Sequence, residues 1–228
     1  MMFKRVNLAL IGPPGSGKGS YGRHFAKAFD IPLVTVSSVL KKFRPNLNLS
    51  SGVLINDQVV TEALLEALIE ENEINSKQGY ILDGFPRTVS QIYLMKELWP
   101  TSFQIQAALK LDIPDKVCET KILGRRICSK CDSNFSVNGV DFDGFDLPAS
   151  HPQDCHKCVP DRDWQIREDD KPELVKDRLA MYHRHMGPIT KIFKENNQLL
   201  ELRPYKGYHD IPILISTVHN FLSSHRTN

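Results

Sequence analysis

One nine-residue segment constrains the fold of this chain more than any other. Residues 12–20 read GPPGSGKGS, directly after the apolar run 6–11 and directly before a helix-compatible stretch at 21–29. In the Walker A arrangement, glycines let backbone N–H groups turn toward phosphate oxygens, and a lysine, here Lys18, reaches the β- and γ-phosphates. The positive end of the following helix adds to the attraction for an anion. The segment predicts a phosphate-binding loop between a strand and a helix; the alternative is a glycine-rich turn with a chance lysine.

The composition excludes few classes of protein. The chain has 228 residues, of which 41% are hydrophobic and 25% charged, so it can bury one core with insertions. Its net charge of +2 gives no general case for nucleic acid or an anionic membrane as partner. No apolar stretch approaches twenty residues, and no cleavable apolar leader precedes the first apolar run. We expect a cytoplasmic protein without a membrane or nucleic-acid partner, with the mitochondrion as the alternative location.

Hydrophobic periodicity predicts the fold class. Apolar runs alternate with helical patterns, which is typical of a parallel sheet covered on both faces. We therefore expect an α/β fold: a doubly wound, parallel, five-stranded sheet with helices on both faces. A stripe within 61–72 predicts a helix packed in the core. The apolar runs lie at 6–11, 31–36, 79–82, 106–112 and 198–202, and the stripe consists of Leu64, Leu65, Leu68 and Ile69.

The periodicity fails between residues 127 and 165, a segment too long for an ordinary connection, which predicts a small separate subdomain. Cys128 and Cys131 form one CxxC pair, and Cys155 and Cys158 form another. Each such pair can turn two thiolates toward one ion, so the four cysteines predict a structural zinc site with no place for a catalytic water. Disulfides are the alternative, which the expected intracellular location disfavours.

Three further features bear on this segment. His151 and His156 could replace a thiolate, but a complete cysteine set leaves them no vacancy. Cys118 lies in a helical pattern and is interpreted as a buried thiol. The segment DKPE at 170–173 predicts a capping box with proline in the first turn of the next helix. The loops of the segment between residues 127 and 165 are acidic, which argues against binding to the phosphate backbone of a nucleic acid. Their acidic residues include Asp132, Asp141, Asp143, Asp146 and Asp154.

A second motif follows the apolar run at 79–82. Asp83 ends that run, and such an aspartate can hold magnesium in a phosphate-loop site. Gly19 stands where a magnesium-ligating Ser or Thr is usual, so Ser20 would supply the hydroxyl. Arg87 adds a fork suited to a phosphate. Each arginine alone is more often a solvated surface cation, but together with the loop they predict a phosphoryl-transfer cage; the others stand at Arg125, Arg126, Arg167 and Arg178.

Together these motifs resemble the adenylate kinase family of nucleoside monophosphate kinases, in its long-lid, zinc-containing form. The resemblance covers nearly the whole chain: the loop at 12–20, the DGFPRT segment at 83–88, GRR at 124–126, the four cysteines, and REDD at 167–170. It implies a small nucleoside-monophosphate-binding segment at 35–61 and a zinc-ribbon-like lid at 125–169. The remaining ranges form the phosphate-loop core: 1–34, 62–124 and 170–228.

The same resemblance implies roles for individual residues. Lys18 and Arg125 would grip the donor phosphates, Arg87 and Arg167 the transferred group, and Arg178 the acceptor side. Asp83, with Lys18 and Ser20, would organise the metal and phosphates. Gln91 would read the acceptor adenine. The other donor-side residues would be Gly15, Ser16, Gly17, Gly19, Lys121, Asn134, Phe135 and Lys206. The other acceptor-side residues would be Val36, Lys41, Val59, Val60 and Gly84.

The resemblance implies the reaction NTP + AMP ⇌ NDP + ADP, with ATP or GTP as donor, magnesium on the nucleotide, structural zinc in the lid and a monomeric enzyme. The acceptor segment departs from the family, because Val36 and Lys41 replace a threonine and an arginine. Two other functions stay open from the residues: a weakly catalytic nucleotide-binding regulatory protein, and a zinc-dependent nucleic-acid binder. The assay of ADP formation separates the first from a kinase.

Overall fold

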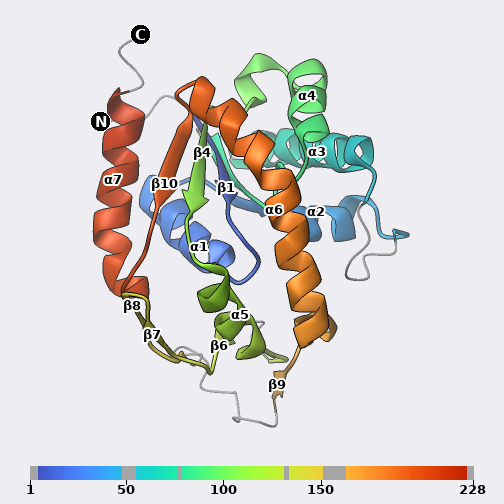
Figure 1. Ribbon diagram of the computed structural model, residues 1–228. Helices are drawn as coiled ribbons and strands as arrows, with labels where there is room; N and C mark the ends of the chain where they lie inside the picture. Colours follow the sequence, from blue (N-terminus) through green and yellow to red (C-terminus); the bar gives the residue numbers. More distant parts are fainter. Residues whose placement is uncertain (1–4, 48–54, 76–78, 131–133, 151–162, 225–228) are drawn as a thin grey trace.

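The computed structural model describes residues 5–47, 55–75, 79–130, 134–150 and 163–224. Its centre is a parallel five-stranded sheet in the order β10-β4-β1-β3-β2, as expected from the apolar runs (Figure 1). In register, Val6 lies beside Gly79 on one side of β1, and Leu8 lies beside Ala107 on the other. The strands are β1 (Val6–Ile11), β2 (Leu33–Thr35), β3 (Gly79–Asp83), β4 (Ala107–Leu111) and β10 (Leu199–Leu202).

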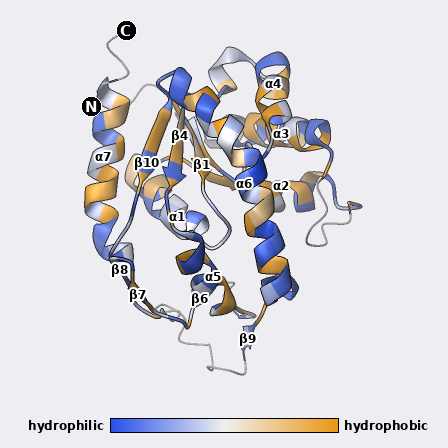
Figure 2. Cartoon of the chain, viewed as in Figure 1, coloured by the Kyte–Doolittle hydropathy of each residue, from blue (hydrophilic) through white to orange (hydrophobic). Residues whose placement is uncertain are grey.

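The sheet is buried on both faces because alternate residues of β1 belong to different hydrophobic clusters. Leu8 and Leu10 face one cluster, whereas Ala9 and Ile11 face the other. Helices α1 (Lys18–Phe29), α5 (Asp115–Leu123) and α7 (Ile211–Ser224) cover the first face. Helices α2 (Val36–Phe43), α3 (Asp57–Asn75), α4 (Val89–Leu98) and α6 (Pro172–Glu195) cover the second. Figure 2 shows hydrophobic strands between helices that carry both hydropathy classes.

The expected stripe on α3 is only partly buried. Leu64 and Leu68 are fully inside the second core, and Leu65 packs against it. Ile69 is 41% exposed, so its assignment to the core was wrong. It directly follows Leu68 in the helix, and this rotation of about 100° carries its side chain away from the sheet.

The segment between α5 and α6 has its own small sheets. Strands β5 (Arg125–Cys128), β6 (Asn134–Ser136) and β9 (Trp164–Gln165) form an antiparallel sheet in the order β6-β5-β9. The hairpin of β7 (Val140–Phe142) and β8 (Phe145–Leu147) joins the first hydrophobic core instead. The backbone N–H of Asp146 donates to the carbonyl of Tyr205 at 2.8 Å. This hairpin is therefore docked on the loop after β10.

The start of α6 differs from the expected capping box. The residue before the helix is Lys171, and no side chain caps it. Pro172 does stand in the first turn, where its missing N–H costs no hydrogen bond. Asp170 lies in a short 3₁₀ helix, η2 (Glu168–Asp170), and its carboxylate binds Arg125. The prediction that Asp170 caps α6 was wrong, because its carboxylate binds Arg125, which lies forty-five positions away in the sequence.

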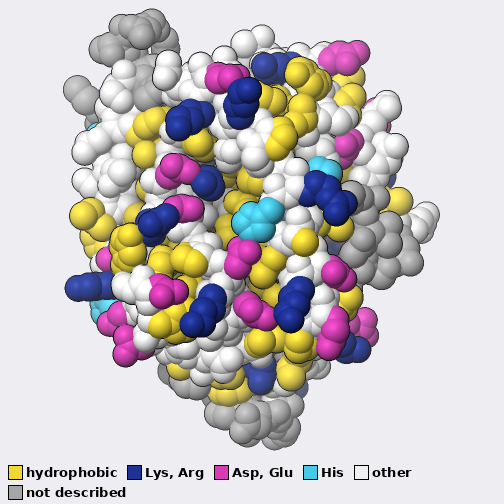
Figure 3. Space-filling model, viewed as in Figure 1, with side chains coloured by type: hydrophobic (Ala, Val, Ile, Leu, Met, Phe, Trp, Pro, Cys, Tyr) yellow, Lys and Arg dark blue, Asp and Glu magenta, His cyan; other side chains and the backbone are white. Residues whose placement is uncertain are grey.

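Among the described residues no helix is long and apolar enough to cross a membrane. On the face shown in Figure 3, cationic and acidic side chains are interspersed and no large area carries one sign. The remaining short helices are η1 (Thr101–Phe103) and η3 (Gly207–Asp210).

Candidate active site

The glycine loop joins the end of β1 to the start of α1, as the motif predicts. Gly15 and Gly17 have φ angles of +85° and +83°, which L side chains rarely adopt. A Cβ on Gly15 would also lie 2.5 Å from the carbonyl oxygen of Cys118 on α5. Gly17 is the residue before α1, so the loop ends where the free N–H groups of that helix begin. The conformation suits an anion in front of α1.

Lys18 folds back over its own loop. Its Nζ donates to the carbonyl oxygens of Gly12 at 2.7 Å and Pro13 at 2.9 Å. Burial lowers the pKa of Lys18 from 10.5 to about 8; the charge of Asp83 opposes that shift, while Arg87 and Arg178 add to it. The ammonium is thus held by neutral carbonyls, which a phosphate can replace.

Asp83 is the last residue of β3 and faces the first turn of α1. A Cβ built on Gly19 would lie at van der Waals contact with Asp83 Oδ2, 3.5 Å away, so this carboxylate lies directly beside the residue that follows the lysine. Burial raises the pKa of Asp83, while the charges of Lys18, Arg87 and Arg23 lower it. Ser20, the expected second oxygen ligand, accepts from Arg23 Nη2 at 3.3 Å.

Arg87 follows β3 in a tight turn. Its Nε donates to the carbonyl of Gly84 at 2.8 Å, and Gly84 has φ +86°. A Cβ on Gly84 would lie 2.9 Å from Arg87 Nη2, so the glycine lets the guanidinium lie over the turn. Asp83 thus lies beside the residue that follows Lys18, and Arg87 is held on the turn directly after Asp83. The charges of Lys18 and Arg87 both lower the pKa of Asp83.

Three of the other four arginines gather around two aspartates at the entry to α6, whereas Arg126 donates to the backbone carbonyl of Arg125 at 2.8 Å. Arg125 Nε donates to Asp170 Oδ2 at 2.7 Å, and a second guanidinium nitrogen donates to the other oxygen. Arg167 makes a two-pronged contact with Asp169 at 2.9 and 3.1 Å. Arg178 Nη1 donates to the Asp169 carbonyl at 2.7 Å and lies 3.3 Å from Asp170 Oδ1. We call these five residues the arginine–aspartate cluster.

The comparisons with known proteins agree with this geometry. The adenylate kinase family model matches residues 10–198. The chain belongs to the adenylate kinase family. It is 30% identical over 228 residues to a GTP:AMP phosphotransferase of Plasmodium falciparum, covering 95% of this chain and 97% of that protein. It is also 31% identical over 205 residues to an adenylate kinase of Caldicellulosiruptor bescii, covering 86% of this chain and 90% of that protein. The chain is therefore a nucleotide phosphotransferase.

The acceptor-side residues are placed in several environments. Val36 and Val60 are 6% and 4% exposed and pack in the second hydrophobic core. Val59 is partly buried, and Lys41 is exposed on α2. Gln91 is 4% exposed and bonds to protein groups at both ends of its amide. The side chains of Val36 and Val60 pack in the second core, which leaves their backbone groups as the polar atoms they present.

The donor-base residues lie around the small sheets. Lys121 Nζ donates to the carbonyls of Asn138 and Pro148 at 3.1 and 3.3 Å, and burial lowers its pKa. Asn134 is exposed at the start of β6. Phe135 is 7% exposed and makes an edge-to-face contact with Trp164, with ring centroids 4.8 Å apart. Phe135 therefore stabilises the β5–β6–β9 sheet.

The last donor-base residue, Lys206, is exposed at the start of η3, where its backbone N–H donates to Asp210 at 2.8 Å. Cys118, expected to be a buried thiol, is fully buried on α5, and burial raises its pKa to about 12. The prediction of a buried thiol at Cys118 is therefore confirmed.

Only one of the four expected zinc ligands can be examined. Cys131, Cys155 and Cys158 lie outside the described residues, as do His151 and His156. Cys128 is buried at the end of β5, and the N–H of Lys130 donates to its sulfur at 3.4 Å. An N–H from two residues later pointing at the sulfur suits a thiolate in a CxxC turn. Within the described ranges, no group of three or more metal-ligating side chains occurs.

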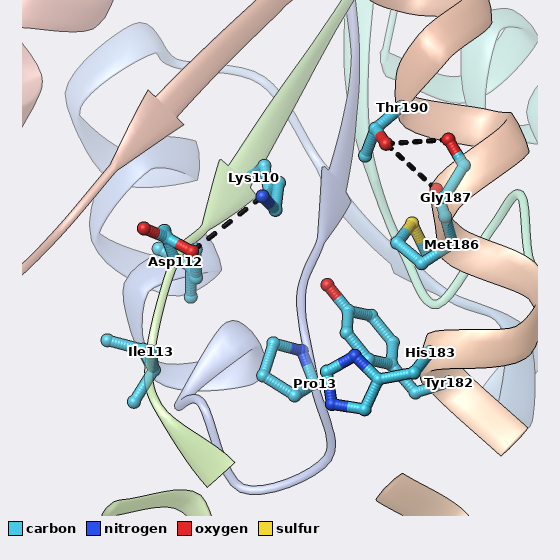
Figure 4. Close-up of a pocket in the computed structure, with 10 residues that line it drawn as sticks. Pro13, Lys110, Asp112, Ile113, Tyr182, His183, Met186, Gly187 and Thr190 are labelled. Atoms are coloured by element: carbon cyan, nitrogen blue, oxygen red, sulfur yellow. Dashed lines mark hydrogen bonds and ion pairs between the residues drawn. The ribbon is translucent and has the colours of Figure 1, made fainter. Parts of the chain in front are cut away.

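A separate pocket of about 220 Å³ lies between the end of β4, the glycine loop and α6 (Figure 4). Its walls include Pro13, Lys110, Tyr182 and His183. None of the expected site residues lines it. Lys110 is paired with Glu201 at 2.6 Å, and His183 lies 2.8 Å from Asp115. We assign this pocket no part in phosphoryl transfer.

Sequence reasoning missed three carboxylates that hold the site together. Asp169 was seen only as part of a family motif and Asp170 only there and as a helix cap, although three arginines surround them. Asp57 was missed altogether: its carboxylate accepts from Thr88 Oγ1 and from Gln91 Nε2, both at 2.7 Å. Its position in the first turn of a helix is a weak signal, because acidic residues are common there for the helix dipole alone.

Proposed function

We propose that this enzyme transfers the terminal phosphoryl group of ATP or GTP directly to AMP, giving NDP and ADP. The observation that carries the proposal is that Asp83 lies at the carboxyl end of β3, on the carboxyl edge of the parallel sheet, beside the residue after Lys18 and with Arg87 held on the next turn. Ligands of open α/β sheets bind at that edge. Phosphoryl transfer needs positioned cations and little covalent chemistry, which is what this edge supplies.

Each cation has a distinct part in the proposal. Lys18 exchanges the Gly12 and Pro13 carbonyls for donor phosphate oxygens. Arg87 binds the acceptor phosphate or the transferred group with the guanidinium nitrogens left by its single bond to Gly84. Arg125, Arg167 and Arg178 neutralise charge that develops on the transferred group. Because a guanidinium has five donors, each can do so while keeping a contact with Asp169 or Asp170.

Magnesium fits the residues at the loop. Asp83 offers a carboxylate beside Gly19, and Ser20 offers a hydroxyl, which are the hard oxygen donors that magnesium prefers. When bound, the ion neutralises charge on the donor phosphates. Asp83 also stabilises the protonated form of Lys18, whose pKa its charge raises. We propose that these two effects make Asp83 essential to donor binding.

The donor base is left open between adenine and guanine. The Plasmodium relative is named for GTP, whereas the bacterial relatives are named adenylate kinases. The name of the Plasmodium relative gives AMP as the acceptor. AMP is also consistent with Gln91 as the residue that reads the acceptor base. The proposal keeps all the expected acceptor residues, which are Val36, Lys41, Val59, Val60, Gly84, Arg87, Gln91, Arg167 and Arg178. On the donor side it keeps the loop 15–20, Lys121, Arg125, Asn134, Phe135 and Lys206.

The decisive experiment measures turnover with each pair of ATP or GTP and AMP, CMP, GMP or UMP by a coupled assay of diphosphate formation. We expect AMP to be the best acceptor with one of the two purine donors. A rate no higher than that of Lys18→Ala for every pair would contradict the kinase and leave the regulatory nucleotide-binding protein. A salt-sensitive gel shift with nucleic acid is the corresponding test of the zinc-dependent binder, and we expect none.

We further propose one structural zinc ion held by Cys128, Cys131, Cys155 and Cys158 in a lid at 125–169. The support is the CxxC spacing and the N–H of Lys130 at the Cys128 sulfur. Cys128→Ala should lose zinc and thermal stability while folded protein keeps its transfer mechanism. Cys118→Ala is the matched control, because it removes a buried thiol from α5 without touching the ligand set. If reduced wild-type protein contains no zinc and gains no stability from it, the cysteines have another role.

The domain division at 1–34, 62–124 and 170–228 with an acceptor segment at 35–61, the monomeric state and the cytoplasmic location stay predictions. The docked β7–β8 hairpin bears on the first of these, because it belongs to the lid in sequence and to the main core in packing. Size-exclusion chromatography with light scattering tests the monomer.

A further inference from the structure

A carboxylate at the start of α3 is bonded to the turn that carries Arg87. Asp57 Oδ2 accepts from Thr88 Oγ1, and Asp57 Oδ1 accepts from Gln91 Nε2, both at 2.7 Å. Gln91 Oε1 in turn accepts from the backbone N–H of Arg87 at 2.7 Å. Thr88 also caps α4, because its Oγ1 accepts from Gln91 N at 3.2 Å. The network joins residues thirty-one and thirty-four positions apart.

The network fixes which end of the Gln91 amide is oxygen. A carboxylate only accepts, so the atom facing Asp57 must be Nε2; the Arg87 N–H only donates, so the atom facing it must be Oε1. A flipped amide would place two acceptors together at one end and two donors together at the other. Gln91 is 4% exposed, so water cannot relieve either contact. Two independent partners therefore hold one orientation.

The remaining hydrogen-bonding capacity of Gln91 has a defined polarity. After the contacts with Asp57 and Arg87, Nε2 keeps one N–H and Oε1 keeps one lone pair that none of the described residues uses. Adenine presents a 6-amino donor and an N1 acceptor, which match these two groups. Hypoxanthine presents an O6 acceptor and an N1–H donor, in the opposite arrangement. A fixed amide can therefore distinguish the two bases, whereas a free amide could turn to suit either.

We infer that Asp57 is a positioning residue that locks the Gln91 amide and thereby makes the acceptor site select 6-aminopurine over 6-oxopurine nucleotides. This inference rests on the proposed transfer to AMP. Asp57 acts through Gln91 and needs no contact with the substrate. It is also not needed to cap α3, since Asn56 Oδ1 accepts from the backbone N–H groups of Gln58 and Val59 at 2.9 and 3.3 Å.

The test compares AMP with IMP as acceptor in the wild type and in Asp57→Ala. We expect the variant to raise KM for AMP about 10-fold with kcat within about twofold, because a hydrogen bond to a charged group is lost outside the reacting atoms. The ratio of kcat/KM for AMP to that for IMP should fall about 10-fold for the same reason. Asp57→Asn should recover most of that ratio, since its carbonyl can accept from Nε2 while its amide faces the Thr88 hydroxyl.

Glu66→Ala is the matched control. Glu66 also lies on α3 and pairs with Arg44 at 2.7 Å, so its loss loosens the same helix without touching Gln91. We expect its AMP-to-IMP ratio to equal that of the wild type. If Asp57→Ala does not fold, Asp57→Ser carries the same expectation, because Asn56 still caps α3 and serine is too short for both contacts.

The outcomes separate the inference from the function on which it rests. A wild type that does not phosphorylate AMP would contradict the proposed function. A wild type that does so, with a ratio unchanged within twofold in the folded Asp57 variants, would overturn the role of Asp57 alone. A lower melting temperature with an unchanged ratio would also overturn it, because a purely structural carboxylate would do the same.

Discussion

The glycine loop and the arginine–aspartate cluster hold their cations in opposite ways. Lys18 is bonded to two neutral carbonyls, and the nearby carboxylate of Asp83 is the main charge that stabilises its protonated form. Arg125, Arg167 and Arg178 each contact a carboxylate directly, at Asp169 or Asp170. The positive charge at the glycine loop is therefore largely available to attract an anion. At the arginine–aspartate cluster, the two carboxylates balance much of the positive charge.

The difference indicates how the glycine loop and the arginine–aspartate cluster each bind a nucleotide. At the loop, a phosphate replaces weak acceptors, so little rearrangement of charge is needed. At the cluster, a phosphate must share the guanidinium groups with two carboxylates. This sharing is possible because one guanidinium can donate to two acceptors at once. We expect the loop to dominate binding of the donor and the cluster to respond as the transferred group develops charge.

The largest expected effect is at the loop. Lys18→Ala should lower kcat/KM by about 10³-fold or more, comparable with the loss of other phosphate-clamping cations. The change should leave the fold intact, because Lys18 contributes hydrogen bonds only within its own loop. Turnover and circular dichroism on the same sample check both statements. A folded variant with a tenth of wild-type activity would show that the loop does not dominate as the comparison requires.

The next effect concerns stability at the cluster. The Asp170 side chain is completely buried and binds Arg125 and Arg178, so Asp170→Ala leaves Arg125 without its carboxylate, while Arg178 keeps Asp169. Removing one partner of a buried ion pair costs about 3–5 kcal/mol in the free energy of unfolding. Urea titration measures this loss.

Asp112→Ala provides the control for that measurement. Asp112 pairs with Arg203, but the two side chains are 34% and 49% exposed. An exposed pair contributes about 0–1 kcal/mol, so this variant should unfold near the wild type. Equal losses from both variants would mean that the cluster is not electrostatically special, and the contrast with the loop would fail.

Sequence predicted the features that depend on neighbouring residues. The alternation of apolar runs placed all five strands of the central sheet, and the loop motif placed Lys18 at the start of α1. It also predicted that Asp83 and Arg87 would lie near the loop, because ends of parallel strands meet at one edge. These inferences need only local periodicity and the topology of a parallel sheet.

Features that depend on distant partners could not be predicted in this way. Asp170 looked like a helix cap, but Arg125 takes its carboxylate. Nothing in the sequence indicated that the Gln91 amide is held from two sides, by Asp57 and by the backbone of Arg87. Ile69 extended an apolar stripe, but the helix turns it to solvent. In each case local pattern allowed two environments, and packing between separate elements chose one.

The smallest expected effect is the uptake of a proton by Lys18 when the donor binds, which the arginines of the cluster cannot show. Folding lowers the pKa of Lys18 from 10.5 to about 8, so the unfolded chain binds more protons between those values and the contribution of Lys18 to stability rises with pH across that interval. A donor phosphate at Nζ should raise the pKa again and draw a proton from solution. At pH 8, binding of a non-hydrolysable donor analogue should therefore take up about half a proton, and at pH 7 about a tenth. Arginine keeps its proton at these pH values, so the cluster adds nothing to the proton uptake.

Calorimetry in Tris and in HEPES at each pH measures the uptake from the difference in buffer ionisation heat. Lys18→Arg keeps the charge but not the titration and should abolish the uptake. If uptake at pH 8 persists in Lys18→Arg, the proton goes to another group, and the distinction between a titrating loop and a permanently charged cluster is lost.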